Sequence, residues 1–294
     1  MARLLCIILA SGTLAGSGGA ATPGQGSIIF RCGDNICRVA PDGSGRTQLT
    51  KNGRSPGPSY GWLSATKDGS RFGVAFGNEA YVLDGSGRRV KGPFRKNGAV
   101  LQAQIRPDGR QLATIEQVPE LIAQLPPNPP IQVLTPFLYL TGVSGTGRDV
   151  VARSTATAGW RGNRLMRDET SQAKPFEQGI CLLATNSSHE CARPLAVDPD
   201  HDLWGPAASP DGRYIAVARA PLKAFAGQIA IYSAATGARV RSLTHGRDSQ
   251  PSWSPDGKNI VFTRGRSLFV VPAAGGPARR ITAGIQPIWV TAAP

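Results

Sequence analysis

The stretch Trp253-Ser-Pro-Asp-Gly-Lys-Asn-Ile-Val261 joins a tight turn to the start of an apolar strand. Proline presets φ at the second position of such a turn, aspartate hydrogen-bonds its own backbone, and glycine adopts the left-handed conformation that lets the next strand begin. The same turn recurs along the chain, which marks a repeated structural unit. The four copies place their aspartate and glycine at Asp68 and Gly69, Asp108 and Gly109, Asp211 and Gly212, and Asp256 and Gly257.

A second recurring feature, a glycine-rich turn between two strands, follows these turns at a regular distance. The strand Gln228–Tyr232 runs into the turn Ala235–Arg239, and the strand Ser267–Val271 runs into the turn Ala274–Arg279. Each unit therefore has four strands, called A to D in chain order, with the Asp-Gly turn between A and B and the glycine-rich turn between C and D. Four antiparallel strands in this order form one blade of a β-propeller.

The number of blades follows from the length of the repeat. Removing the first 21 residues leaves 273, and setting aside a proline-rich insertion at 117–135 leaves 254. Six blades would have about 42 residues each, the usual period of such repeats, whereas seven would have only about 36. The first expected strand, Ser27–Phe30, has no strand A before it, whereas the last, Ile285–Val290, resembles the strand A at Gln250–Trp253. We expect an all-β, six-bladed propeller of four-stranded blades whose C-terminal strand completes blade one.

Composition and charge agree with this architecture. The 294 residues include 36 Gly and 24 Pro, which favours many turns and disfavours a helix bundle. The 33 Lys and Arg exceed the 19 Asp and Glu, and the net charge of +14 would attract polyanions. Arginines follow the C-to-D turns instead of clustering with aromatic residues, so we expect no specific nucleic-acid partner and keep an anionic envelope polymer as a candidate. These arginines are Arg46, Arg88, Arg148, Arg239 and Arg279.

The N-terminus has the three parts of a signal peptide. Arg3 supplies a positive charge, Leu4–Leu14 is mostly apolar, and Gly19–Ala21 is a small-residue cleavage site. We therefore predict a signal peptide at 1–21 and a secreted or periplasmic protein. No later apolar run reaches the length of about 18 residues expected of a transmembrane helix, so none is predicted.

Export changes how the cysteines are interpreted. The mature chain would keep two sequence-local pairs, Cys32 with Cys37 and Cys181 with Cys191. Each pair flanks a turn, and cysteines facing each other across an antiparallel hairpin lie close enough for a disulfide. A four-cysteine metal site is the alternative, but neither pair has the two-residue spacing of a zinc knuckle. We predict two disulfides.

The repeated Trp-Ser-Pro-Asp-Gly pattern, clearest at Trp253–Val261, resembles the WD40-like repeats of the TolB-type six-bladed propeller family. Periplasmic TolB and the propeller domains of prolyl-oligopeptidase-type peptidases share that family. The resemblance implies a single propeller domain over 22–294, but no particular activity, because propellers serve many tasks. No residues remain for the α/β-hydrolase domain of the peptidases, so we expect a protein that is not an enzyme.

Catalytic motifs are weak in this sequence. Gly53-Arg-Ser55-Pro-Gly57 matches the nucleophile elbow of hydrolases only by spacing, because it lacks the strand-to-helix context. Pro56 follows the serine and has no N–H to donate to an oxyanion. We predict no catalytic residue, no metal site and no cofactor.

A cluster of acidic residues and a histidine is the strongest candidate for a binding site. Asp198-Pro-Asp200-His201-Asp202 is expected in the D-to-A crossover loop, near one mouth of the central channel, where Asp248 lies in the next blade. Such oxygen ligands suit Ca²⁺, although the spacing is not that of an EF-hand and a turn-capping role is the simpler interpretation. The candidate binding residues are Asp202, Asp248, His201 and Trp204.

The insertion at 117–135 interrupts the period of blade three. We expect one helical turn at Glu120–Leu125 and an extended segment at Pro126–Pro130, because proline cannot donate a ladder hydrogen bond. Long insertions of this kind can form a binding surface, and an ornamental loop is the alternative.

The sequence therefore favours a secreted, monomeric, non-enzymatic propeller that binds a protein or an anionic envelope polymer at one channel mouth. The alternative is a metal-dependent hydrolase or lyase of the propeller type, with Asp202, His201 and Asp248 at the channel.

Overall fold

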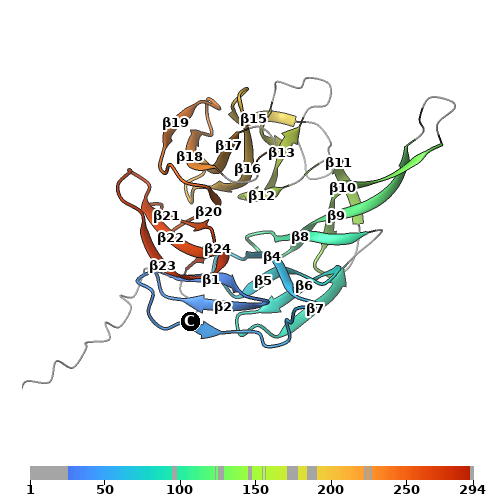
Figure 1. Ribbon diagram of the computed structural model, residues 1–294, viewed down its shortest axis with the longest axis horizontal. Helices are drawn as coiled ribbons and strands as arrows, with labels where there is room; N and C mark the ends of the chain where they lie inside the picture. Colours follow the sequence, from blue (N-terminus) through green and yellow to red (C-terminus); the bar gives the residue numbers. More distant parts are fainter. Residues whose placement is uncertain are drawn as a thin grey trace, which may run out of the picture.

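Six four-stranded antiparallel sheets surround a central axis in the computed structural model (Figure 1), which confirms the predicted six-bladed propeller. The structure describes residues 26–94, 98–122, 124, 129–144, 148–153, 155, 157–170, 178–183, 191–221, 224 and 227–291. The predicted signal peptide lies outside the described residues. Within them there is no helix, and hence none of the length and apolar character needed to cross a membrane.

Each blade runs from an inner strand at the axis to an outer strand at the rim. Blade one contains β24 (Ile285–Val290), β1 (Ser27–Cys32), β2 (Asn35–Val39) and β3 (Thr47–Gln48). Blade two contains β4 (Tyr60–Ala65), β5 (Arg71–Phe76), β6 (Glu79–Asp84) and β7 (Arg89–Phe94). Blade three contains β8 (Ala99–Ile105), β9 (Gln111–Ile122), β10 (Ile131–Gly142) and β11 (Arg148–Arg153).

The other three blades repeat this order. Blade four contains β12 (Ala158–Arg161), β13 (Arg164–Thr170), β14 (Gln178–Leu183) and β15 (Cys191–Val197). Blade five contains β16 (His201–Ala208), β17 (Tyr214–Pro221), β18 (Gln228–Ser233) and β19 (Arg239–Ser242). Blade six contains β20 (Asp248–Trp253), β21 (Asn259–Arg264), β22 (Ser267–Pro272) and β23 (Arg279–Ala283).

The ring is closed by the two ends of the described chain. In Figure 1 the red strand β24 lies beside the blue strand β1, and the two pair antiparallel with Ile28 opposite Trp289 and Ile29 opposite Ile288. The predicted completion of blade one by the C-terminal strand is therefore confirmed.

The hydrophobic core lies between blades. Each of six buried clusters combines side chains from two neighbouring blades. At the closing interface, for example, Phe30 and Trp289 of blade one pack against Val261 and Leu268 of blade six. Because every apolar blade face is covered by the next blade, the stability of each blade depends on its neighbours.

The Asp-Gly turns between strands A and B share one hydrogen-bond pattern. Asp211 Oδ1 accepts from Ser209 Oγ at 2.6 Å and from the backbone N–H of Arg213 at 3.0 Å. Gly212 has φ of 70°, the left-handed region that favours glycine. In blade three Arg106 replaces the hydroxyl donor, and its Nε donates to Asp108 Oδ1 at 2.7 Å.

These donors lower the pKa of the turn aspartates. The hydrogen bond from Arg106 brings the pKa of Asp108 to about 2, and the hydroxyl of Ser209 lowers the pKa of Asp211. The ionised form is therefore favoured in the folded protein relative to the unfolded chain, where the pKa of aspartate is about 3.9.

We predict that the protein loses stability as the pH falls from about 4 towards 2. A lowered pKa in the folded state contributes stability above the unfolded pKa, and this contribution disappears as pH falls through the folded pKa. Urea unfolding at pH 7 and pH 3 should show a lower midpoint at pH 3, and Asp108→Asn should reduce the difference. The exposed Asp200→Asn is the control, and an equal pH effect in the two variants would contradict the role of Asp108.

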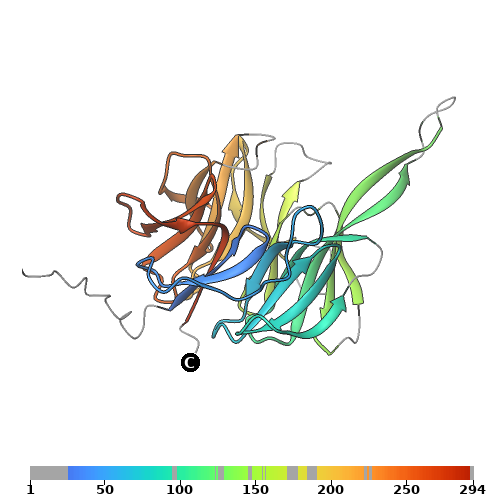
Figure 2. The same ribbon diagram turned by 60° about the horizontal axis from the view of Figure 1, so that its bottom comes forward.

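The insertion in blade three extends the blade's two middle strands into a long hairpin. β9 and β10 pair from Gly142 opposite Gln111 out to Ile131 opposite Ile122, and the hairpin projects from the ring in Figures 1 and 2. The predicted helical turn at Glu120–Leu125 is wrong for residues 120–122, because the partner strand supplies ladder hydrogen bonds there. Leu125 lies outside the described residues.

Both predicted disulfides are present, with Cα–Cα distances of 5.8 Å for Cys32–Cys37 and 5.5 Å for Cys181–Cys191. Contrary to the expectation from the sequence, the two cysteines of each pair are not directly opposite each other. Cys37 is opposite Phe30, and Cys181 is opposite Pro194, so each bond links diagonal positions of a strand pair. Diagonal neighbours are farther apart across the ladder, and the twist of the strands brings these pairs within reach.

We predict that a chain truncated after Gly284 fails to form the ring. Without β24, the core between blades six and one would lose Trp289, and β1 would expose an unpaired edge. Size-exclusion chromatography and near-ultraviolet circular dichroism should report aggregation or loss of tertiary structure. Removing only residues 292–294 is the control, and cooperative unfolding of the monomeric truncated chain would contradict the prediction.

Candidate functional site

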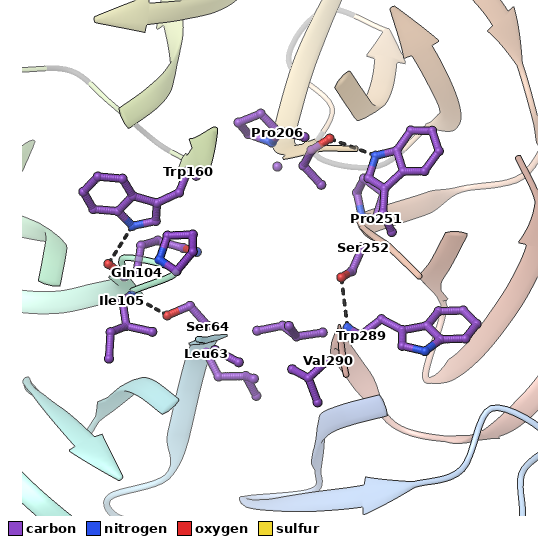
Figure 3. Close-up of a pocket in the computed structure, with 18 of the residues that line it drawn as sticks. Leu63, Ser64, Gln104, Ile105, Trp160, Pro206, Pro251, Ser252, Trp289 and Val290 are labelled. Carbon is purple, nitrogen blue, oxygen red and sulfur yellow. Dashed lines mark hydrogen bonds between the residues drawn. The ribbon is translucent and has the colours of Figure 1, made fainter. Parts of the chain in front are cut away.

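The propeller axis contains a cavity of about 390 Å³. Its walls come from β4, β8, β12, β16, β20 and β24, the inner strands of all six blades, together with the Asp-Gly turns that follow several of them. Figure 3 shows this cavity surrounded by residues that are far apart in the sequence, including Ser64, Trp160 and Pro251.

Hydrogen bonds between neighbouring inner strands hold the wall together. Ser64 Oγ accepts from the backbone N–H of Ile105 at 2.6 Å, and Trp160 Nε1 donates to the backbone oxygen of Gln104 at 3.0 Å (Figure 3). Ser252 Oγ accepts from the backbone N–H of Trp289 at 3.0 Å. Each bond joins consecutive blades, so the shape of the cavity depends on the correct seating of the blades.

The rings of Trp160 and Trp289 point away from the cavity and into the blades in Figure 3. The lining residues are prolines, glutamines and small side chains, together with larger apolar ones such as Trp62, Leu63 and Ile288. Among the lining residues, only Lys67 is ionisable. The cavity therefore offers hydrogen bonds and apolar surface, but almost no charge. The glutamines are Gln102, Gln104, Gln250 and Gln286, and the prolines are Pro107, Pro206, Pro210, Pro251, Pro255 and Pro287.

Two of these glutamines have an unusual backbone. Gln250 and Gln286 have φ of 55° and 56°, and each precedes a proline at an irregular point of an inner strand. Non-glycine residues in this region cost about 1–3 kcal/mol each and persist only where surrounding contacts hold them. Blade six provides such contacts, because the Gln286 N–H donates to Gln250 Oε1 at 3.2 Å and to Thr263 Oγ1 at 3.0 Å.

The side chain of Gln286 is buried without a hydrogen bond to its Oε1 from any described residue. Only 8% of the residue is exposed, and within the described part of the chain its Oε1 has no hydrogen-bond partner. The equivalent atom of Gln250 accepts bonds from Thr263 and from the backbone of the next blade. The hydrogen-bond pattern of Gln250 is therefore not repeated at Gln286 of blade one.

The four residues predicted to bind a ligand lie elsewhere. His201, Asp202 and Trp204 belong to β16, and Asp248 is the first residue of β20, so they are at the starts of inner strands and not in crossover loops. The loop placement is wrong because strand pairing begins earlier, with His201 opposite Pro221 and Asp248 opposite Arg264. None of the four lines the cavity, and no group of three metal-ligating side chains forms among the described residues.

His201 and Trp204 have partners within blade five. His201 Nδ1 lies 3.1 Å from Asp198 Oδ1, and Arg219 Nε donates to Asp198 Oδ2 at 2.6 Å. Burial raises the pKa of the Asp198 carboxyl, but hydrogen bonds from Arg219 and Tyr232 outweigh it, so the pKa is lowered overall. Trp204 Nε1 donates to the backbone oxygen of Ala224 at 2.9 Å.

Asp248, at the start of the inner strand of blade six, forms a second charged pair. Its carboxylate is fully buried and accepts two hydrogen bonds from Arg264, at 2.7 Å and 2.8 Å. Asp202 is also buried, with 5% exposed. A carboxylate already bound to a guanidinium has less capacity to attract a cation, so the geometry of Asp248 favours a structural role.

Sequence reasoning missed Gln250 and Gln286. Their signal was the Gln-Pro pair repeated in two strands A, at 250–251 and 286–287, which served only to identify the C-terminal strand. Glutamine is common on surfaces, and nothing in its spacing reveals a left-handed backbone or an open acceptor.

The geometry defines a six-bladed β-propeller whose axial cavity is lined by a single ionisable residue, Lys67. Residues 209–291 match the family model of the dipeptidyl peptidase IV (DPP IV) N-terminal region. An uncharacterized peptidase, YuxL of Bacillus subtilis, is 32% identical over 99 residues, which cover 29% of this chain and 15% of that protein.

The fold is that of the TolB propellers. TolB from Acinetobacter baumannii superposes with a TM-score of 0.67 at 18% identity, covering 90% of this chain and 66% of that one. A chain from a nidogen/laminin complex gives a TM-score of 0.66 at 11% identity, covering 90% of this chain and 99% of that one. At such low identities these likenesses establish the fold alone. The chain spans about two thirds of that TolB and a small part of the peptidase.

We predict that Arg264→Met destabilises the protein by about 2–4 kcal/mol, because it leaves the Asp248 carboxylate buried without its cation. This destabilisation is set below the usual cost of breaking a buried ion pair, because solvent reaches Arg264 and screens the pair. Urea unfolding would measure the loss, and Asp248→Asn combined with Arg264→Met should recover most of it. The exposed Arg266→Met is the control, and an equal loss in both arginine variants would exclude a specific ion-pair effect.

Proposed function

We propose that this protein is a secreted, non-enzymatic propeller that binds a cell-envelope ligand at its axial cavity. The predicted signal peptide and the two disulfides support this location, because disulfides persist in oxidising compartments. The similarity in fold to TolB is compatible with a scaffold role. A propeller supports binding well, because loops and turns from six blades meet at each mouth of its channel.

The observation that carries this proposal is the buried Oε1 of Gln286, which has no hydrogen-bond partner among the described residues, at a cavity whose lining includes one ionisable residue, Lys67. A buried acceptor without a partner costs about 1–3 kcal/mol. Because Oε1 is itself buried, a ligand that brings an N–H or O–H group into the cavity would recover this free energy once the Gln286 side chain turns its Oε1 towards the cavity. Because only Lys67 among the lining residues can carry charge, we expect the part of the ligand that enters to be uncharged.

A peptide group is the ligand chemistry that this channel already accommodates. The Gln102 carboxamide binds the main chain of the neighbouring blade, accepting from Ala158 N at 3.1 Å and donating to Ala158 O at 3.2 Å. We therefore propose that the ligand is an uncharged segment of a partner protein. The nidogen/laminin complex contains a propeller of this fold within a protein assembly.

The second candidate is an enzymatic role, which the match to the dipeptidyl peptidase IV N-terminal region and the likeness to the YuxL peptidase favour. In that case the chain would act as the propeller of a peptidase, or as a metal-dependent hydrolase or lyase. Peptide or oligosaccharide turnover by the purified protein, with added divalent cations, would establish this alternative and overturn the non-enzymatic proposal.

We predict that Gln286→Met weakens ligand capture at least tenfold without lowering stability. Methionine keeps the length of the side chain and removes the carboxamide, and Oε1 makes no hydrogen bond that the fold would lose. The immobilised protein would be exposed to the envelope fraction of its source, and retained proteins would be quantified by mass spectrometry.

Gln228→Met, a half-buried glutamine outside the cavity, is the matched control. Retention of the same proteins by the wild type and Gln228→Met, with loss in Gln286→Met, is the expected result. Equal retention by all three would overturn the cavity as the binding site, and urea midpoints would verify that the variants are folded.

A further inference from the structure

The hairpin of blade three continues beyond the sheet that supports it. β8 accompanies β9 only as far as Gln117, opposite Ala99, and β11 accompanies β10 only as far as Phe137, opposite Arg153. Farther out, the described residues of the two strands pair only with each other. We call residues 118–122 and 131–136 the arm. Figures 1 and 2 show from two directions that the arm projects away from the ring.

The arm exposes large apolar side chains on both of its faces. Leu121 is 76% exposed, Leu134 is 59% exposed and Ile131 is 44% exposed. Cross-strand partners share a face, and the register places Leu121 and Leu134 on one face and Ile131 on the other. A two-stranded ribbon with this much exposed apolar surface is marginal in water, which indicates that something covers the arm.

Charge distinguishes the arm from its surroundings. Glu120 is the single charged residue between 117 and 136. The adjoining segments 86–116 and 137–153 contain nine Lys and Arg against three Asp and Glu, and the whole chain has a net charge of +14. The molecule therefore combines a mainly apolar projection, which carries the single carboxylate of Glu120, with a basic body.

We propose that the arm inserts into the interface of a lipid membrane that carries anionic headgroups. Anionic lipids attract basic residues near the surface, and apolar side chains gain free energy when they enter the boundary between headgroups and acyl chains. A second copy of the chain would bring another strongly basic body, and a flat protein surface would cover one face of the arm. A lipid interface surrounds the arm and covers both faces.

The depth of insertion is limited by the backbone. No strand of the described chain pairs with the outer edges of the arm, and unpaired N–H and C=O groups are costly in hydrocarbon. Pro119 and Pro136 lack an N–H and lower the number of such donors. The arm therefore lies in the headgroup region, with Leu121 and Leu134 reaching the acyl boundary, and it does not cross the bilayer. This inference is independent of the ligand proposed for the cavity.

Vesicle binding tests the proposal. The purified protein would be sedimented with vesicles of equal parts phosphatidylglycerol and phosphatidylcholine, and with phosphatidylcholine alone. We expect binding to the anionic vesicles, at least tenfold weaker binding after L121S/L134S, and weaker binding in 0.5 M salt, because salt screens the charges. V90S/V240S is the matched control, since Val90 and Val240 are exposed apolar residues on the outer strands β7 and β19.

A second measurement locates the contact. A polarity-sensitive fluorophore on Gln132→Cys, which shares the face of Leu121, should shift to the blue when anionic vesicles are added. Absence of vesicle binding, equal binding by L121S/L134S and V90S/V240S, or an unshifted fluorophore would overturn the proposal. So would a concentration-dependent dimer that L121S/L134S abolishes, because a second copy would then cover the arm. Circular dichroism and urea midpoints would establish that all variants are folded.

Discussion

The pairing of β24 with β1 is the interaction on which the rest of the ring depends. Five blades take their inner strand from adjacent sequence, whereas blade one takes it from the opposite end of the chain. Every core cluster lies between two blades, so an open ring would expose apolar surface on both blades that should meet. The entropy of closing so long a loop grows only with the logarithm of its length. Burial of Trp289 and Val290 at the two flanking interfaces offsets that cost.

Closure also determines the chemistry of the cavity. Six inner strands converge on one axis, and the rings of Trp160 and Trp289 turn into the blades. The lining combines prolines, glutamines and apolar side chains, and Lys67 is its one ionisable residue. The irregular positions before proline turn the backbone of Gln250 and Gln286 into the left-handed region. The hydrogen bonds that hold the Gln286 backbone come from blade six, while its own Oε1 has no partner among the described residues. The open acceptor is therefore a product of how the blades meet.

The fold could be predicted because its determinants are local. The Asp-Gly turn of blade five needs only Ser209, Asp211 and Gly212, which are adjacent in sequence, and its repetition reveals the blades. The candidate site could not be predicted in the same way. Asp248 was predicted to bind a ligand because a carboxylate can hold a cation. In the structure that cation is Arg264, which comes from the next strand of the same sheet. In the arm, a helical turn was predicted from Glu120 onwards, yet residues 120–122 lie within a regular strand pair, because their partners come from the far side of the insertion.

The basic charge has more than one role. Arg219 and Arg264 neutralise buried carboxylates, and the guanidinium of Arg89 lies 4.1 Å from the ring centre of Tyr81, where cation–π attraction stabilises the outer part of blade two. Part of the charge therefore belongs to the fold and is unavailable to a partner. At the blade turns, Arg46, Arg88, Arg239 and Arg279 are exposed, and none of these four lines the cavity. Exposed arginines can thus attract anionic surfaces at long range, while a different part of the molecule, the cavity, binds an uncharged ligand.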